Sequence, residues 1–229
     1  CRHGSAEKLL MQPVNFNPTK HLNGIKVFLF MVCLVPLLRL AWGAWQNELG
    51  ANPIEFVTRS LGDWTLNFLL ITLTISPLRK LTGWHWILRL RRMLGLYTFF
   101  YAVLHLTTYL WLDQFFDWSA IAKDILKRPF ITIGMSTFVL LIPLAATSSN
   151  AMIRRLGGRR WQQLHRSIYV IAIFAVVHYW WMVKLDTRQP LIYAIILGML
   201  LSIRALWREQ ERRRQLTRSG TPQPPNCVT

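Results

Sequence analysis

Six apolar runs separated by polar segments constrain this chain more than any other feature of its sequence. The hydrocarbon core of a bilayer is roughly 30 Å thick, and a helix needs about 20 apolar residues to cross it. Inside lipid the backbone must satisfy its own hydrogen bonds, so each run is expected to form a helix. The runs comprise residues 25–45, 64–78, 93–112, 130–146, 164–183 and 191–206. The sequence therefore predicts an all-α polytopic membrane bundle of about six transmembrane helices.

The basic residues alternate between the segments that flank and join these runs. Of the 27 lysines and arginines, 18 lie in four alternate segments, namely 1–24, 79–92, 147–163 and 204–229. The three segments between them hold six, together with seven of the ten acidic residues. Because basic loops are retained in the cytoplasm, this alternation predicts a multi-pass inner-membrane protein with both termini cytoplasmic.

The same pattern divides the chain into three regions. Residues 1–24 form a cytoplasmic segment, residues 25–207 form the bundle, and residues 208–229 form a basic, Pro-rich tail that we expect to be disordered. No internal repeat is evident. The net charge of +17 is explained by membrane topology and by contact with anionic lipid, so the bilayer is an expected partner and nucleic acid is not.

Three histidines, His105, His165 and His178, lie inside the predicted spans. A histidine in hydrocarbon is unfavourable without a partner, which makes each a candidate functional residue. At 1.5 Å per residue, His105 and His178 lie about 18 Å and about 21 Å from the cytoplasmic ends of their runs. Two imidazoles at one depth can bind a single haem iron from both sides. The alternative is that each histidine only hydrogen-bonds across helices.

The charged residues give weaker indications of function than the histidines. The predicted spans contain no Asp or Glu, which argues against a proton-coupled transporter and against a carboxylate metal site. Arg91, Arg92 and Arg166 lie near the cytoplasmic ends of their runs and are candidates for contact with haem propionates or a flavin phosphate, although topology explains them equally well. Arg39 lies within the first run, where its long side chain can extend to the interface. Because no Gly-rich nucleotide motif occurs, the reductant is expected to come from another protein.

Four stretches resemble a known family. They are LRRMLGLYTFFYAVLHLTTY at 90–109, KRPFITIG at 127–134, RWQQLHRSIYVIAIFAVVHYWW at 160–181 and QPLIY at 189–193. Over residues 25–207 the chain is similar to the MsrQ family, formerly called YedZ. These are the haem-binding membrane subunits of the bacterial periplasmic methionine sulfoxide reductase system, within the ferric reductase-like transmembrane superfamily.

This resemblance implies an electron-transfer subunit that contains haem b. It implies that His105, His165 and His178 are the haem-iron ligands and that a cytoplasmic flavin reductase or a membrane quinone is the electron donor. The acceptor would be an MsrP-type molybdopterin subunit that reduces methionine sulfoxide in periplasmic proteins. Descriptions of the family also include FMN, although no residue of this chain identifies an FMN site.

The chain departs from the wider superfamily at one place. NADPH oxidases and ferric reductases place two histidines on the third helix and two on the fifth, but here the third run offers only His105. Arg91 and Arg92 occupy the level at which a second histidine would be expected. His165 and His178 also differ by about 220° around an ideal helix, so they do not share a face unless that helix is distorted. One haem held by His105 and His178 is the primary prediction, and a second haem at His165 is left open.

Two other functions fit the same bundle. A transmembrane ferric or other metal reductase would donate electrons directly to an extracellular metal ion. A non-catalytic membrane anchor or small transporter would use its histidines only for hydrogen bonds between helices. Dependence on a periplasmic partner distinguishes the electron-transfer subunit from a metal reductase. Bound haem distinguishes it from an anchor or transporter.

Overall fold

The computed structural model describes residues 22–183 and 187–219, which contain helices and no strands. The α-helices are α1 (Leu22–Trp45), α2 (Pro53–Thr82), α3 (Leu88–Thr108), α4 (Trp118–Lys127), α5 (Pro129–Ala146), α6 (Asn150–Leu156), α7 (Gly158–His165), α8 (Ile168–Met182) and α9 (Arg188–Ser219). A 3₁₀ turn at His85–Ile87 precedes α3, and a π-helical turn at Tyr109–Asp113 follows it.

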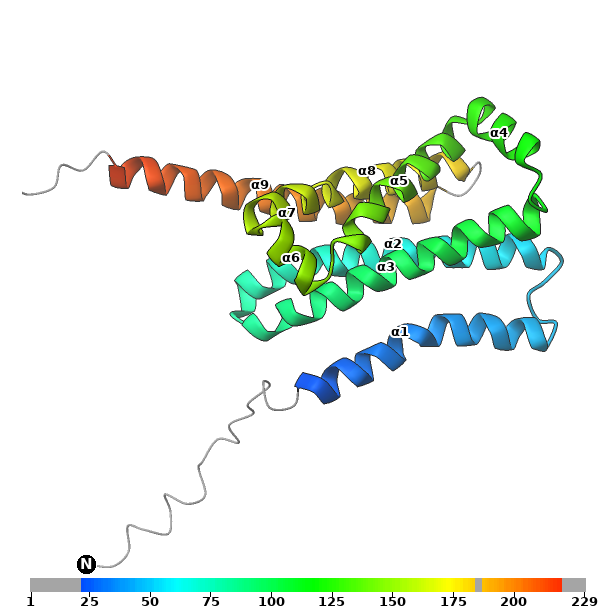
Figure 1. The fold of residues 1–229 in the computed structure, drawn as a ribbon, viewed down its shortest axis with the longest axis horizontal. Coiled ribbons are helices and arrows are strands. Elements are labelled where there is room, and N and C mark those ends of the chain that lie inside the picture. The colour runs from blue at the N-terminus through cyan, green and yellow to red at the C-terminus, as the bar shows by residue number, and fades with distance from the viewer. Residues whose placement is uncertain (1–21, 184–186, 220–229) are drawn as a thin grey trace, which may run out of the picture.

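The long helices run roughly antiparallel along one axis (Figure 1). Helices α2 and α3 lie side by side, α5 packs against α8, and α9 contacts both α8 and α2. Helix α4 lies at one end of the bundle, and α6 and α7 lie at the other, where α9 also leaves it. The described chain enters α1 and leaves α9 at this same end, as a bundle with an even number of passes requires.

Five helices among the described residues, α1, α2, α3, α5 and α9, are long and apolar enough to cross a bilayer. Helix α8 has only 15 residues and is about 22 Å long at 1.5 Å per residue, although it also passes along the bundle between α7 and α9. Large apolar side chains such as Phe28 on α1 and Met199 on α9 are exposed, which in water would leave an extensive apolar surface. The chain is a multi-pass helical membrane protein, as predicted.

Helix α2 is longer than its apolar run. It begins at Pro53, where Asn52 caps it by accepting a hydrogen bond from the Glu55 backbone N–H at 3.3 Å. The polar first turns of α2 therefore contain Glu55 and Asp63, which corrects the expectation that the spanning helices contain no acidic residue. The cap and the proline determine where α2 begins, and a hydropathy pattern detects neither of them.

Helix α9 also extends beyond its predicted end. It continues to Ser219, although we expected the bundle to end at residue 207 and the tail from residue 208 to be disordered. Ion pairs between Glu209 and both Arg212 and Arg213, at 3.0 and 2.9 Å, support the helix in this polar stretch. Residues 220–229, and residues 1–21 of the predicted N-terminal segment, lie outside the described residues.

The fifth predicted span, residues 164–183, is divided in the structure. Helix α7 ends at His165, and α8 begins at Ile168 after a turn. In this turn the Ser167 hydroxyl donates to the Leu164 carbonyl at 2.8 Å, and the Ser167 backbone N–H donates to the same carbonyl at 3.1 Å. A serine that hydrogen-bonds to the nearby backbone competes with the regular helical pattern. His165 and His178 therefore lie on different helices.

Buried side chains form two clusters. The larger one joins α2, α3, α5, α8 and α9, and its most buried members include Leu69, Leu73 and Ile171. The smaller one is aromatic at its centre, where the ring centroids of Phe68 on α2 and Tyr101 on α3 are 5.1 Å apart. Because lipid is as apolar as these side chains, close packing is the main contribution that such contacts make to helix association.

Candidate functional site

The structure brings His105 of α3 and His178 of α8 together. The centroids of the two imidazole rings are 6.4 Å apart, and their planes differ by 76°. Both rings are partly buried inside the bundle. Two histidines separated by 73 positions in the sequence thus lie next to each other inside the bundle.

Each imidazole is held by a backbone carbonyl of a different helix. Nδ1 of His105 lies 2.8 Å from the carbonyl oxygen of Thr58 on α2. Nδ1 of His178 lies 2.7 Å from the carbonyl oxygen of Phe130 on α5. A carbonyl can only accept a hydrogen bond, so Nδ1 carries the proton in both rings and Nε2 carries a lone pair.

This geometry fits one metal ion between two imidazoles. A metal–imidazole nitrogen bond is about 2 Å long in zinc sites, and an ion bound by two opposed Nε2 atoms at such a length separates the ring centroids by about 6 Å. A hydrogen bond from Nδ1 to a carbonyl is the usual way in which proteins orient a histidine ligand. The 6.4 Å separation of His105 and His178 and the two Nδ1 bonds therefore fit a bis-imidazole site.

The donor set indicates which kind of metal centre these residues suit. Across residues 22–183 and 187–219, no group of three or more His, Cys, Asp or Glu side chains is placed to hold a metal ion. A zinc ion normally takes three or four protein ligands, whereas haem iron needs only axial ligands because the porphyrin supplies the others. Two histidines without a third protein ligand are therefore the donor set expected for haem.

His165 does not join this pair. Its ring stacks on Trp161 of α7, with a centroid distance of 3.9 Å, and its Nδ1 lies 3.1 Å from the Trp161 carbonyl oxygen. The positive charge of Arg91 is near enough to interact with the ring of His165. The structure thus places Arg91 of α3 close to His165, at the opposite end of the bundle from α4.

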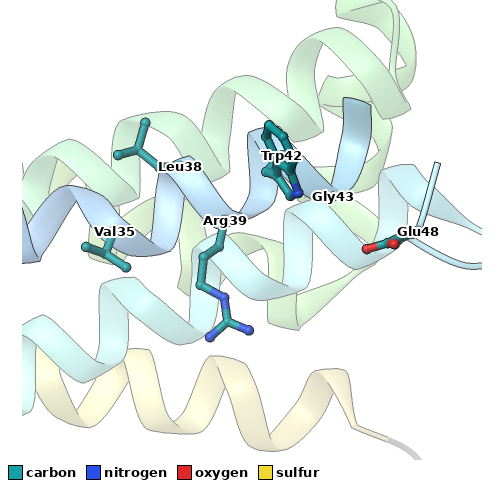
Figure 2. Close-up of a pocket in the computed structure, with 6 residues that line it drawn as sticks. All are labelled: Val35, Leu38, Arg39, Trp42, Gly43 and Glu48. Carbon is teal, nitrogen blue, oxygen red and sulfur yellow. The ribbon is translucent and has the colours of Figure 1, made fainter. Parts of the chain in front are cut away.

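The other arginines singled out by the sequence lie apart from the histidine pair. A terminal guanidinium nitrogen of Arg92 donates to the side-chain oxygen of Asn150 at the start of α6, at 2.5 Å. Arg166 is exposed in the turn between α7 and α8. Arg39 lines an open hollow of about 410 Å³ with five other residues of α1 and the turn after it. Figure 2 shows Arg39 extending from α1 in the direction opposite to Leu38 and Trp42.

The residues that hold the imidazoles were not predicted from the sequence. Thr58 lies outside the predicted spans because α2 begins earlier than its apolar run, and Phe130 was expected only as the first residue of the fourth run. Both act through backbone carbonyls, which every residue possesses. No side-chain pattern identifies a residue whose carbonyl accepts such a bond.

Comparison with known proteins agrees with this architecture. Residues 60–176, which include His105 and end two residues before His178, match the family of ferric reductase like transmembrane components. A protein of Azospira oryzae described as the protein-methionine-sulfoxide reductase heme-binding subunit MsrQ is 59% identical over 87% of this chain and 84% of its own length. Proteins of Herminiimonas arsenicoxydans and Ralstonia nicotianae with the same description are 54% and 52% identical, over 91% and 83% of this chain and 97% and 88% of their own. This chain therefore belongs to the MsrQ family of ferric reductase-like transmembrane proteins.

Proposed function

We propose that this protein binds b-type haem between His105 and His178 and passes electrons through the bacterial inner membrane to the catalytic partner of a methionine sulfoxide reductase system. The main support is the pair of opposed imidazoles, 6.4 Å apart, whose Nδ1 protons are both donated to carbonyls. The relatives' description as heme-binding subunits adds independent support.

The polypeptide positions the cofactor and sets its surroundings. Haem b, when bound, supplies a one-electron Fe(III)/Fe(II) couple. The carbonyls of Thr58 and Phe130 fix the tautomer of each imidazole, which leaves the Nε2 lone pairs of His105 and His178 available as ligands. Carbonyl acceptors at Nδ1 also increase the basicity of the imidazoles, which favours the oxidised iron and lowers the reduction potential.

The proposed direction of transfer follows from the charges. The end of the bundle with α6 and α7 has the larger share of basic residues and is assigned to the cytoplasm. Electrons would enter at this end from a flavin reductase or a membrane quinone, near His165 and Arg91. A second haem at His165, or an FMN whose phosphate contacts Arg91 or Arg166, belongs to the same proposal and rests on the family resemblance together with this local positive charge.

At the other end the acceptor is an MsrP-type molybdopterin subunit. Reduction of methionine sulfoxide to methionine takes two electrons and two protons and releases one water. A haem couple delivers one electron at a time, so two transfers through this protein support one turnover of the partner. The exposed ends of α3 and α8, which hold His105 and His178, are nearest to this acceptor.

A visible spectrum of the detergent-purified protein, oxidised and dithionite-reduced, tests haem binding. We expect sharp low-spin b-type bands that are lost or converted to high-spin bands in His105→Ala and in His178→Ala. The matched control is His85→Ala, because His85 is exposed in the connection between α2 and α3. Wild-type protein that shows no haem bands, although it was made with ample haem, would contradict the proposal and favour the anchor or transporter.

The matched family also favours a second candidate, a metal reductase that donates directly to extracellular Fe(III). The two functions differ in the acceptor of the electrons. Dithionite-reduced protein in liposomes should be reoxidised by an oxidised MsrP-type partner much faster than by chelated Fe(III). Faster reoxidation by the iron chelate would support the metal reductase instead.

A further inference from the structure

Each imidazole of the pair lies against a glycine of the helix that supplies its carbonyl partner. A Cβ atom at Gly62 of α2 would lie 3.1 Å from Cε1 and 3.2 Å from Nδ1 of His105. A Cβ atom at Gly134 of α5 would lie 2.7 Å from Cε1 and 2.8 Å from Nδ1 of His178. The second pair of distances is shorter than side-chain carbons normally allow, so the ring of His178 depends on the absence of a side chain at position 134.

The two glycines occupy the same position relative to the carbonyls. Gly62 follows Thr58 by four residues, and Gly134 follows Phe130 by four residues. In an α-helix each Cβ is tilted toward the N-terminus, so the side chain at one position covers the turn that contains the carbonyl four residues earlier. A glycine there leaves that carbonyl open to a second hydrogen-bond donor from a neighbouring helix. The imidazole Nδ1 is this donor at both places.

The local sequences also correspond. Gly62 and Gly134 are each followed three residues later by a threonine, Thr65 or Thr137, whose hydroxyl donates at 2.8 Å to the carbonyl of the residue just before the glycine. The sequences that end in the two histidines, YAVLH at 101–105 and FAVVH at 174–178, share the pattern aromatic, Ala, Val, aliphatic, His. This repeat was not expected from the sequence, because its two short parts are recognisable only once the structure pairs α2 with α3 and α5 with α8.

We propose that the site consists of two equivalent half-sites, one made by α2 and α3 and the other by α5 and α8, and that Gly62 and Gly134 are its positioning residues. Each glycine allows the imidazole of the partner helix to reach a backbone carbonyl, and this contact fixes where Nε2 lies. The inference rests on the proposed haem function, because only bound haem gives the position of Nε2 a role as an iron ligand. The contact between glycine and imidazole is a property of the chain itself.

The distances predict graded effects of alanine substitution. Gly134→Ala forces the ring of His178 to move or its hydrogen bond to Phe130 to break, whereas Gly62→Ala requires a shift of only a few tenths of an ångström at His105. Two other helical glycines serve as matched controls. A Cβ at Gly95 of α3 would make an ordinary contact of 3.9 Å with Thr72, and a Cβ at Gly198 of α9 would have no neighbour within 4 Å among the described residues.

The first test is spectroscopic. Purified Gly134→Ala protein is expected to lose haem or convert it from low spin to high spin, Gly62→Ala to shift the bands or the midpoint potential by less, and Gly95→Ala and Gly198→Ala to match wild type. Wild-type bands and potential in Gly134→Ala would overturn the inference and leave haem binding intact. Absence of haem from the wild-type protein would instead overturn the proposed function.

The second test needs no haem. In the haem-free protein, Gly134→Ala should lower the melting temperature while His178 is present and should be tolerated when it is combined with His178→Ala, because the conflicting ring is gone. The same cycle applies to Gly62→Ala with His105→Ala, with a smaller effect. If Gly134→Ala destabilises the protein equally with and without the His178 ring, or if neither version folds, the glycine serves helix packing alone and the inference is wrong.

Discussion

The guanidinium of Arg204 on α9 donates a hydrogen bond to the backbone carbonyl of Leu73 on α2. That carbonyl lacks its usual helical donor, because the residue four positions later is Pro77, which has no N–H. Arg204 is almost completely buried, and its guanidinium also lies 5.1 Å from the ring centroid of Tyr169 on α8. A charge that is unfavourable in the membrane is therefore used to satisfy a carbonyl freed by a proline.

This relationship predicts strong coupling between positions 204 and 77. Arg204→Leu leaves the Leu73 carbonyl unpaired and should lower stability by about 1–3 kcal/mol. Pro77→Ala restores the backbone donor, so Arg204→Leu should be less destabilising in that background. Thermal unfolding of the two single variants and the double variant in detergent measures the coupling. Additive effects would show that Arg204 does not serve the carbonyl.

The attachment of α1 gives a second prediction. The Tyr101 hydroxyl donates to the Cys33 carbonyl at 2.7 Å, and the Tyr97 hydroxyl donates to the Phe30 carbonyl at 2.9 Å. Tyr101→Phe should lower stability by about 1 kcal/mol and increase proteolysis of the loop after α1, without changing the haem spectrum, because α1 contributes nothing to the histidine pair. Tyr109→Phe is the control, since its hydrogen bond to Asp124 is long, at 3.5 Å. A haem spectrum that changes with Tyr101→Phe would contradict this assignment.

His165 allows the two ends of the bundle to be tested separately. Its ring contacts Trp161 and lies on a different helix from His178. We expect His165→Ala to retain the low-spin bands that depend on His105 and His178, while any haem bound at the cytoplasmic end is lost. Haem content per chain by pyridine haemochrome, measured beside the spectrum, gives the number of sites. Loss of all low-spin haem in His165→Ala would show that this histidine is also needed at the site of His105 and His178.

Orientation is tested by labelling with a membrane-impermeant maleimide in spheroplasts. In a background without Cys1, Cys33 and Cys227, Glu48→Cys, at the end of the bundle with α4, should be labelled. Arg159→Cys in α7 should react only after the membrane is permeabilised. The reason is the excess of basic residues at the α6–α7 end, because basic segments of membrane proteins are generally retained in the cytoplasm. The reverse labelling pattern would place the histidine pair at the cytoplasmic end.

Much of the bundle could be predicted because hydropathy and helix rise are local properties. The fourth run, residues 130–146, differs from α5 by one residue, and the depths of His105 and His178 followed from counting along helices that enter the membrane from the same side. The start of α2 could not be predicted in this way, since its first turns are polar and depend on the Asn52 cap. The division between α7 and α8 likewise depends on hydrogen bonds at Ser167, which cannot be recognised from the apolar content of the segment.

The two histidines of the candidate site could be identified from the sequence, whereas the residues that position them could not. Histidine is rare in hydrocarbon, so His105 and His178 were conspicuous in the sequence. Their partners are the carbonyls of Thr58 and Phe130, and which carbonyl meets which imidazole depends on how two helices are rotated against each other. Glycine occurs in membrane helices for several reasons. A positioning role for Gly62 and Gly134 could therefore be inferred only from their distances to the imidazole rings.

The arrangement of the two histidines also concerns how the protein is assembled. His105 belongs with α2 and α3, and His178 belongs with α5 and α8, so an iron bound by both would be a cross-link between two parts of the bundle that are made at different times during synthesis. Since a ligand that binds only the native state stabilises it, haem capture and final helix docking become a single equilibrium. The cofactor would then act as a late assembly factor, and the supply of haem in the cell would determine how much of the newly made chain reaches its mature form.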